Sequence, residues 1–326
     1  MNWIETNWDD WDSSAMFAAL RLRSDVFVVE QDCVYPDLDD KDVQCIHLIA
    51  MEEDAKHGQS ALATARMVPP GVSYAEPSIG RVVTIRTARG GGLGRALMER
   101  AIRICQRHWP RQGIRISAQQ YLIRFYEGFG FVCTGEGYLE DGIPHIEMLR
   151  PAESLAFWKS QHTQAVEKFE SALGAVPENK KRGSPESWGA TEIIQHLQLS
   201  EGGLWRYLKK KSHAKPSELP ATDLDSDRAG IELMRLLESN RRWKDPTGGL
   251  ISPAGDAAEP ARVFDEWRES HGPAWSELNH LFQDSHWWTV KLFKHPLAGY
   301  LSLSDTLAFN AAHIAHHVAQ LERLHS

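Results

Sequence analysis

The sequence predicts two domains, an α+β domain followed by an all-α helical bundle. Its 326 residues are many for a single compact core. Residues 1–150 alternate short β-rich runs with helical patterns, whereas residues 151–326 form amphipathic helical patterns without a convincing strand. All four cysteines lie before residue 150, and eleven of the fifteen histidines lie after it. We therefore place a boundary at Pro151, with Ser154 as the cap of the next helix.

Composition and charge exclude several classes of protein. A net charge of -8 gives no general attraction to nucleic acid. No run of 18 apolar residues predicts a membrane span, and the acidic first residues lack an apolar signal core. Four cysteines without CxxC spacing are typical of reduced thiols rather than of a disulfide framework. We expect a cytoplasmic protein that binds neither nucleic acid nor membrane.

A glycine-rich stretch, "TARGGGLGRALMERAIRIC", lies between a predicted strand and a predicted helix. The residues before it, "RVVTI", are mostly β-branched, and Leu97, Ala101 and Ile104 share one helix face after it. Backbone N–H groups and the dipole at such a helix start favour an anion, and glycines allow a phosphate to approach closely. Neither GxxxxGK[ST] nor GxGxxG is present. A pyrophosphate site is the hypothesis, and a plain tight turn is the alternative.

This stretch resembles the coenzyme A pyrophosphate loop of the GNAT acyltransferases, because Arg89 to Gly94 match R-x-x-G-x-G. The strand-like "GIRISAQQ" and the following "YLIRFYEGFGF", a short helix predicted to end at Gly130, look like the next elements of that family. In "YLEDGIPHIEM" an Asp141-Gly142 turn separates two strand-like runs. Together with residues 22–50, these segments resemble the ElaA-type subgroup over about residues 1–150.

The GNAT resemblance implies a fold and a reaction. The fold is a mixed, mainly antiparallel sheet that splays open, and the reaction is transfer of an acetyl group from acetyl-CoA to an amine on a small molecule or a protein. The pantetheine would pair with the strand from Val83 to Ile85. The resemblance further implies that Tyr126 is the general acid, with an aromatic packed under the cofactor as the alternative. The cofactor contacts that it implies are Val83, Ile85, Arg89, Gly90, Gly92, Gly94 and Arg95.

The general base is left open by the sequence. The predicted strand before the glycine loop carries no glutamate. Candidates are Glu30, His47, Glu140 and His145, each of which is more readily a structural or substrate-contacting residue. The acidic segment "DLDDKD", with Asp37, Asp39, Asp40 and Asp42, is interpreted as a solvated loop. A lip that attracts a cationic amine and a calcium loop are its alternatives.

The second half predicts an antiparallel helical bundle. Apolar periodicity indicates helices over residues 155–173, 190–210, 229–242, 261–282 and 304–324, with Ser304 as the cap of the last. In the last helix His313 and His317 are four apart and share a face, whereas His316 points about 100° away. His196 lies among apolar residues in an earlier helix and could be a core histidine.

The segments "ESWGATEIIQHLQLSE" and "HPLAGYLSLSDTLAFNAAHIAHHVAQLERL" resemble the DinB-like four-helix family. That resemblance implies a divalent metal site formed by His196, His313 and His317. Three imidazoles suit zinc or nickel. The open coordination position would hold water or the thiolate of a low-molecular-weight thiol. A metal-dependent thiol S-transferase, a detoxification enzyme and a non-catalytic metal-binding module are therefore alternatives for this half.

Overall fold

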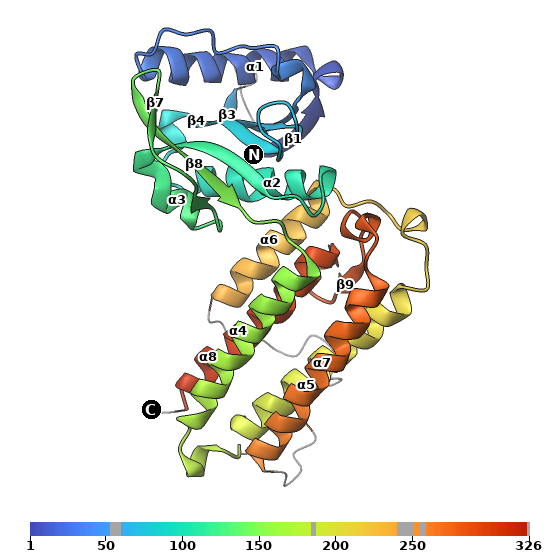
Figure 1. Ribbon diagram of the computed structural model, residues 1–326. Helices are drawn as coiled ribbons and strands as arrows, with labels where there is room; N and C mark the ends of the chain where they lie inside the picture. The colour runs from blue at the N-terminus through green and yellow to red at the C-terminus, as the bar shows by residue number, and fades with distance from the viewer. Residues whose placement is uncertain (53–59, 184–186, 240–250, 254–258, 325–326) are drawn as a thin grey trace. The chain divides into compact units, whose positions relative to one another are not determined.

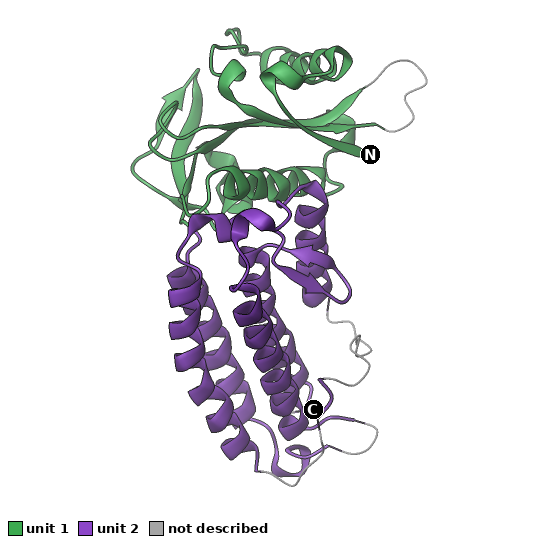
Figure 2. Cartoon of the chain, turned by 90° about the vertical axis from the view of Figure 1, so that its right-hand side faces the viewer, with its two compact units in different colours: residues 1–152 green, residues 153–326 purple. Residues whose placement is uncertain are grey.

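The computed structural model describes residues 1–52, 60–183, 187–239, 251–253 and 259–324. The chain divides into two compact units, Met1–Ala152 and Glu153–Ser326 (Figure 2). Each unit has apolar clusters of its own. One includes Ala19 and Ile49 in the first unit, and another includes Phe169 and Trp267 in the second.

The first unit is built on a mixed sheet. Its strands are β1 (Asn2–Asn7), β2 (Ile46–Met51), β3 (Ala61–Val68), β4 (Ser78–Thr84), β5 (Ile114–Gln119), β8 (Ile143–Arg150) and β6 (Val132–Cys133) in spatial order, with β7 (Tyr138–Glu140) also paired to β8. Only β4 and β5 run parallel, and the other neighbouring pairs are antiparallel. The predicted mixed, mainly antiparallel sheet is confirmed.

Helices cover both faces of this sheet. These helices are α1 (Ser13–Arg23), which continues as the π-helical segment η2 (Ser24–Glu30), α2 (Leu93–His108) and α3 (Ile123–Glu127). Figure 1 shows α1 and α2 on opposite faces, and both contact β3 and β4. Leu97, Met98 and Ile104 of α2 are fully buried, which stabilises the unit by roughly 1.5–3 kcal/mol for each side chain.

Two local predictions concern turns and ends in this unit. The Asp141-Gly142 turn is confirmed, since it joins β7 to β8 with φ of 50° and 79°, the left-handed values of a type I′ hairpin turn. The short helix α3 ends at Glu127, and Gly128 caps it. The predicted end at Gly130 was therefore late, because Gly130 has φ of 81° and cannot continue a helix.

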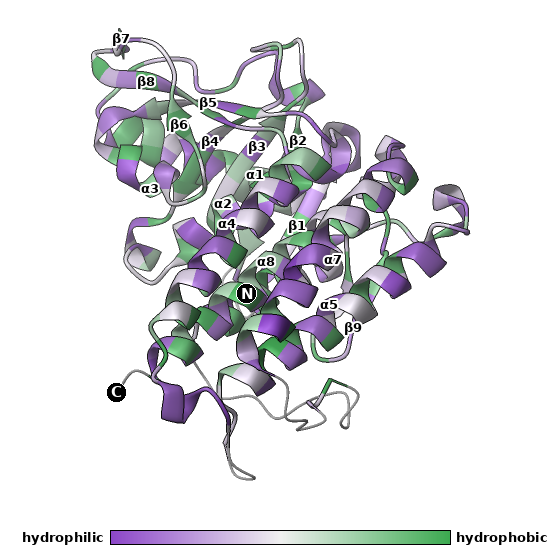
Figure 3. Ribbon diagram, turned by 60° about the horizontal axis from the view of Figure 1, so that its bottom comes forward, coloured by the Kyte–Doolittle hydropathy of each residue, from purple (hydrophilic) through white to green (hydrophobic). Residues whose placement is uncertain are grey.

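The second unit is a bundle of helices. Its long helices are α4 (Leu155–Gly174), α5 (Ala190–Lys211), α6 (Leu224–Glu238), α7 (Pro260–Leu281) and α8 (Leu303–Glu322). The helix α8 packs against α4 and α6, and α5 packs against α7. Hydrophobic and hydrophilic residues lie on different sides of these helices, as expected for bundle packing (Figure 3). Ser154 caps α4 by accepting a hydrogen bond from the Phe157 N–H at 3.1 Å, as the sequence predicts.

Three details of this unit differ from the sequence predictions. A hairpin of β9 (Phe293–His295) and β10 (Gly299–Leu301) packs against α6, although no strand was predicted. Its strands have three residues each, too few to show alternation. Ser302, not Ser304, caps α8, because its Oγ accepts from the Asp305 N–H at 3.0 Å.

The third difference is in the helix predicted over residues 229–242. This helix begins earlier, at Leu224, where Asp223 forms the cap. It ends at Glu238, and residues 240–242 of the prediction lie outside the described residues. In the described part of the chain, no helix is long and apolar enough to cross a membrane.

Because each unit buries its own apolar cluster, residues 1–152 produced alone should fold and bind acetyl-CoA. Circular dichroism during heating should show one cooperative transition, which acetyl-CoA moves to higher temperature. An insoluble or unfolded fragment, beside a stable full chain, would contradict the division.

Candidate functional site

The glycine loop forms the first turn of α2. Gly92 is its N-cap with φ of 85°, a left-handed conformation that costs other residues roughly 1–2 kcal/mol. The first helical bond runs from the Ala96 N–H to the Gly92 carbonyl at 3.0 Å. The N–H groups of Leu93, Gly94 and Arg95 therefore lie before the first hydrogen bond of the helix and point toward the N-terminus of α2. This is the geometry of an anion site.

Two other segments meet the glycine loop. A Cβ built on Gly94 would lie 3.9 Å from the Phe125 ring of α3 and 3.9 Å from the Thr84 methyl group of β4. The Arg95 guanidinium lies over the Phe129 ring, 5.0 Å from its centroid. The start of α2, the end of β4 and the aromatic segment around α3 thus form one site.

The strands β4 and β5 provide the open edge of this site. Their parallel pairing is limited to Ser78 and Arg115, after which the strands diverge. The remainder of β4 keeps its antiparallel partner β3 on the other side. Backbone groups of β4 that face β5 are therefore available to an extended ligand such as pantetheine.

A bulge in β4 decides which backbone groups face that edge. The register passes from Arg66↔Gly80 to Thr64↔Val83, so β4 holds one residue more than β3 over this stretch. The Ile85 N–H donates to the Leu62 carbonyl on the β3 side at 2.8 Å. Backbone N–H and carbonyl groups of successive residues point to alternate edges of a strand, so those of Val83, two residues before Ile85, also point toward β3.

Within the strand from Val83 to Ile85, which is predicted to pair with pantetheine, this arrangement turns the backbone groups of Val83 and Ile85 toward β3. The Ile85 carbonyl also has a partner, the Ala88 N–H, at 3.0 Å. The residues whose backbone groups face the open edge are Val82 and Thr84, and the Thr84 carbonyl is already bonded to Arg89. The predicted pairing came from the family resemblance, which carries no information about where this strand bulges.

Arg89, a predicted cofactor contact at the start of the glycine loop, forms hydrogen bonds to other residues of the first unit. Its guanidinium donates to both carboxylate oxygens of Glu30, at 3.1 Å for the Nη2–Oε2 pair, and to the Thr84 carbonyl at 3.1 and 3.2 Å. The Arg89 hydrogen bond lowers the pKa of Glu30. Glu30 therefore serves as a partner for Arg89 and is poorly suited to be a general base.

Tyr126, the predicted general acid, is 8% exposed and lies on α3 directly after β5. Its ring packs edge-on against Phe125 and Phe131, with centroids 5.2 and 6.1 Å away. Burial raises the pKa of Tyr126 to about 12, from an ordinary value that already leaves the hydroxyl protonated at neutral pH. A protonated phenol can donate a proton or a hydrogen bond to a thiolate leaving group.

The remaining base candidates lie in different places. His47 is buried, its Nε2 is 2.9 Å from the Asp42 carbonyl, and burial lowers its pKa. Glu140 and His145 lie on the hairpin β7–β8. Glu140 accepts from the Ser117 hydroxyl of β5 at 3.0 Å, and the His145 ring stacks on Tyr138. The structure thus makes His47 a core residue and leaves Glu140 and His145 beside β5.

The acidic segment is not the solvated loop predicted from the sequence. Asp37 and Asp42 are 7% and 2% exposed and share the guanidinium of Arg23, which is itself buried. Asp42 and Asp39 also bind Arg66 of β3 at 2.9 and 2.6 Å. Among its four aspartates, only Asp40 is exposed. The carboxylates balance arginines, so they are not set out as calcium ligands or as a lip for a cationic amine.

Sequence reasoning missed this charge network, which also includes Arg81 of β4. Its signal was the presence of Arg23 between Leu22 and the apolar run that follows, and of Arg66 in the apolar strand "ALATARMV". Charged residues within apolar runs need buried partners of opposite sign. A cluster of aspartates nearby in the chain is the natural source of those partners.

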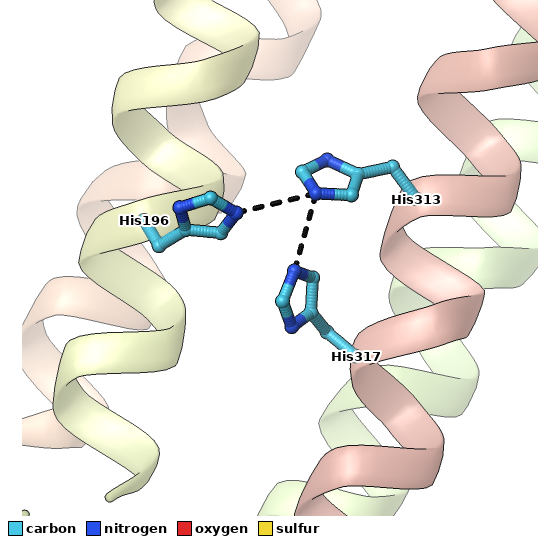
Figure 4. Close-up of side chains that lie close together, drawn as sticks. All are labelled: His196, His313 and His317. Atoms are coloured by element: carbon cyan, nitrogen blue, oxygen red, sulfur yellow. Dashed lines mark hydrogen bonds between the residues drawn. The ribbon is translucent and has the colours of Figure 1, made fainter. Parts of the chain in front are cut away.

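In the second unit, His196, His313 and His317 converge (Figure 4). Their Nε2 atoms are 3.2 Å apart for the pair His196 and His313, and 3.2 Å apart for His313 and His317. His196 comes from α5, and the other two come from α8. His316 instead directs its Nδ1 to the Leu237 carbonyl at 2.9 Å.

The hydrogen bonds at Nδ1 indicate which tautomers these histidines adopt. His196 Nδ1 is 2.9 Å from the Ile251 carbonyl, and His317 Nδ1 is 2.8 Å from the Gln320 side-chain oxygen. Both partners are acceptors, so Nδ1 carries the proton and Nε2 presents its lone pair. Burial lowers the pKa of His317 to about 3 and that of His313 well below its usual value. Neutral imidazoles with convergent lone pairs suit a divalent cation.

A second buried cluster surrounds Glu201 of α5. Its carboxylate accepts hydrogen bonds from four side chains: His162, Trp267, His271 and Asn310. Burial raises the pKa of Glu201, but the hydrogen bonds from His162 and His271 outweigh it and hold the value at about 2. Because Trp275 donates to His162 Nδ1 at 3.4 Å, the proton of His162 lies on Nε2 and points at the carboxylate. The donors around Glu201 make this cluster a hydrogen-bonded carboxylate, although His162, Glu201 and His271 also lie close enough together to hold a metal ion.

Comparisons with known proteins agree with the geometry of the first unit. Residues 35–150 match the family model described as an acetyltransferase (GNAT) domain. A UPF0039 protein from Synechocystis is 41% identical over 149 residues, covering 46% of this chain and 94% of that protein. Protein ElaA from Escherichia coli is 36% identical over 152 residues, covering 46% of this chain and 96% of that protein.

Solved structures are similar over the same region. The crystal structure of an acyl-CoA N-acyltransferase from Pseudomonas aeruginosa has 40% identity and a TM-score of 0.43, and covers 46% of this chain and 98% of its own. The crystal structure of Escherichia coli ElaA has 35% identity and a TM-score of 0.42, and covers 46% of this chain and 98% of its own.

The fold, the glycine loop and these relatives define the first unit as an N-acyltransferase domain that uses an acyl-CoA. The chain belongs to the GNAT acetyltransferase family, and its GNAT domain is of the ElaA or UPF0039 type.

Replacing Gly92 should weaken acyl-CoA binding. Alanine at φ of 85° costs roughly 1–2 kcal/mol, and relief of that strain tilts the N–H groups away from the pyrophosphate, so acetyl-CoA affinity should fall about tenfold. Titration calorimetry measures the change. Gly71→Ala is the matched control, because Gly71 has φ of 86° and open space around it. Unchanged affinity in Gly92→Ala would exclude the loop from the pyrophosphate site.

Proposed function

We propose that the first unit transfers an acetyl group from acetyl-CoA to an amine. The pyrophosphate lies at the start of α2, against the N–H groups that follow Gly92. The pantetheine continues along the open edge of β4, where the backbone groups of Val82 and Thr84 face the divergence from β5. The observation that carries this proposal is the meeting of α2, β4 and α3 at Gly94, Thr84 and Phe125.

In this proposal Tyr126 supplies the proton for the departing thiolate. The attacking amine must lose a proton and the leaving sulfur must be stabilised, so one group on each side of the thioester is expected. Tyr126 follows β5, and burial raises its pKa to about 12, further above neutral than the ordinary value of a tyrosine. Glu140 and His145, on the hairpin beside β5, lie where an amine acceptor would approach that strand. The acceptor is a small molecule or a protein amine.

We propose a second function for the helical unit, the binding of a divalent metal by His196, His313 and His317. The supporting observation is the convergence of the three Nε2 atoms, with Nδ1 of His196 and His317 hydrogen-bonded to acceptors. Zinc or nickel suits a set of three imidazoles. Together with the resemblance of these segments to the DinB-like family, this donor set supports a metal site with an open position.

The ligand at the open coordination position of the metal would decide the activity of the helical unit. Water there gives a structural or hydrolytic site, and a low-molecular-weight thiol there gives thiol transfer or detoxification. A site without turnover would make the unit a metal-binding module. A mass-spectrometric screen of amine and thiol acceptors, with and without acetyl-CoA, distinguishes these activities on the intact protein.

Tyr126→Phe tests the acid role. Removing the hydroxyl should lower kcat about 100-fold, within the range of general acid catalysis, while the Kd for acetyl-CoA changes little. Steady-state kinetics with an amine from the screen and calorimetry with acetyl-CoA give the two values. Tyr121→Phe is the control, since Tyr121 lies five residues earlier and is 75% exposed. Equal kcat in the two variants would leave Tyr126 as a packing residue.

Elemental analysis tests the metal site. After reconstitution with zinc or nickel, metal should be lost in His196→Ala, His313→Ala and His317→Ala but retained in His316→Ala, whose ring bonds Leu237 instead. Metal should also raise the unfolding temperature, because α5 and α8 must be assembled to bind it. The proposal fails if the unaltered protein takes up no metal, or if all four variants lose it equally.

A further inference from the structure

Arg81 occupies the bulge of β4 in a conformation that arginine seldom adopts. Its φ is 50°, in the left-handed region, although it is not glycine. It lies between the two registers of β4, after Gly80 and before Val83. Such a residue persists only where the surroundings offset its strain.

Asp37 provides that offset. The Arg81 Nε is 2.7 Å from Asp37 Oδ1, and the guanidinium also donates to the Asp37 carbonyl at 3.1 and 3.3 Å. Asp37 is held in turn by the Nε of Arg23, at 2.8 Å, and Arg23 is 1% exposed. The guanidinium of Arg81 further lies over the Tyr35 ring. The side chain of Arg81 is thus bound at a buried, charged anchor.

The bulge sets the phase of the rest of β4. With it, Val83 is opposite Thr64, and the Ile85 N–H reaches Leu62. Without it, every later residue would shift by one, since the register at Gly80 would continue unbroken. Val82 and Thr84 would then turn toward β3, and their backbone groups would leave the edge that faces β5.

We propose that the ion pair of Arg81 with Asp37 positions the acyl-CoA by holding the β4 bulge. Arg81 acts through the backbone, so it is a positioning residue rather than a catalytic one. The pair keeps both backbone polar groups of Val82 and the N–H of Thr84 on the open edge, where they receive the pantetheine and the thioester. This inference rests on the proposed path of acetyl-CoA along β4 and adds the device that maintains it.

Two ligands and two variants test the device. Loss of the hydrogen bonds at the open edge should lower the acetyl-CoA affinity of Arg81→Ala about tenfold. ADP carries the pyrophosphate without the pantetheine, so its affinity should change less than about twofold because the glycine loop is intact. Arg81→Gly should restore most of the acetyl-CoA affinity, because glycine adopts φ of 50° without the ion pair. Calorimetry gives the affinities, and the unfolding temperature confirms that each variant is folded.

Arg111→Ala is the matched control, because Arg111 also has positive φ, at 64°, and lies in the loop before β5. Unchanged acetyl-CoA affinity in Arg81→Ala overturns the inference. Equal losses in Arg81→Ala and Arg81→Gly, both folded, also overturn it, since the side chain would then act directly. If the unaltered protein binds neither ADP nor acetyl-CoA, the proposed site fails before the inference is reached.

Discussion

The buried ion pairs of Arg23 with Asp37 and Asp42 connect β4, the strand along the open edge of the acyltransferase site, to α1 and β3. Arg23 belongs to α1, the aspartates precede β2, and the same carboxylates bind Arg66 of β3 and Arg81 of β4. Removing one partner of such a pair leaves an uncompensated buried charge, at a cost of about 3–5 kcal/mol. The geometry of β4 beside its open edge therefore depends on charge pairing as well as on apolar packing.

The helical unit shows how hydrogen-bond partners separate two histidine clusters that look alike in composition. At His196 and His317, acceptors at Nδ1 leave Nε2 as a lone pair that faces the other imidazoles. At His162, the donor Trp275 occupies Nδ1, so Nε2 carries the proton and donates to Glu201. The first arrangement attracts a cation, and the second stabilises a buried carboxylate. Both lie in the bundle core, so burial alone would not distinguish a ligand from a structural histidine.

Features that depend on short-range patterns could be predicted from the sequence. The strand, glycine loop and helix around Gly92 follow from β-branched residues, glycines and helical periodicity, and the hairpin turn follows from Asp141-Gly142. The sequence predicted that His196 lies beside His313 and His317 only through a family resemblance. The spacing of residues along the chain shows which of them share a face of one helix, but it does not show which residues of another helix lie opposite. The Arg23 network joins segments far apart in the chain, so a local pattern showed an acidic segment without its partners.

The edge that each residue of β4 faces has a physical cause. Periodicity assigns alternate residues to alternate edges only while the strand is regular, and one inserted residue exchanges the edges beyond it. Here the residue with left-handed φ is Arg81, whereas Gly80, the residue a reader would suspect, keeps an ordinary conformation. Glycine at position 81 would allow the bulge, but it would not require it. Arg81 binds Asp37, and Asp37 also binds Arg23 of α1, so the bulge is coupled to these buried charges. The side chain of Asp37, which belongs to no strand, therefore helps to decide which backbone groups of β4 face β5.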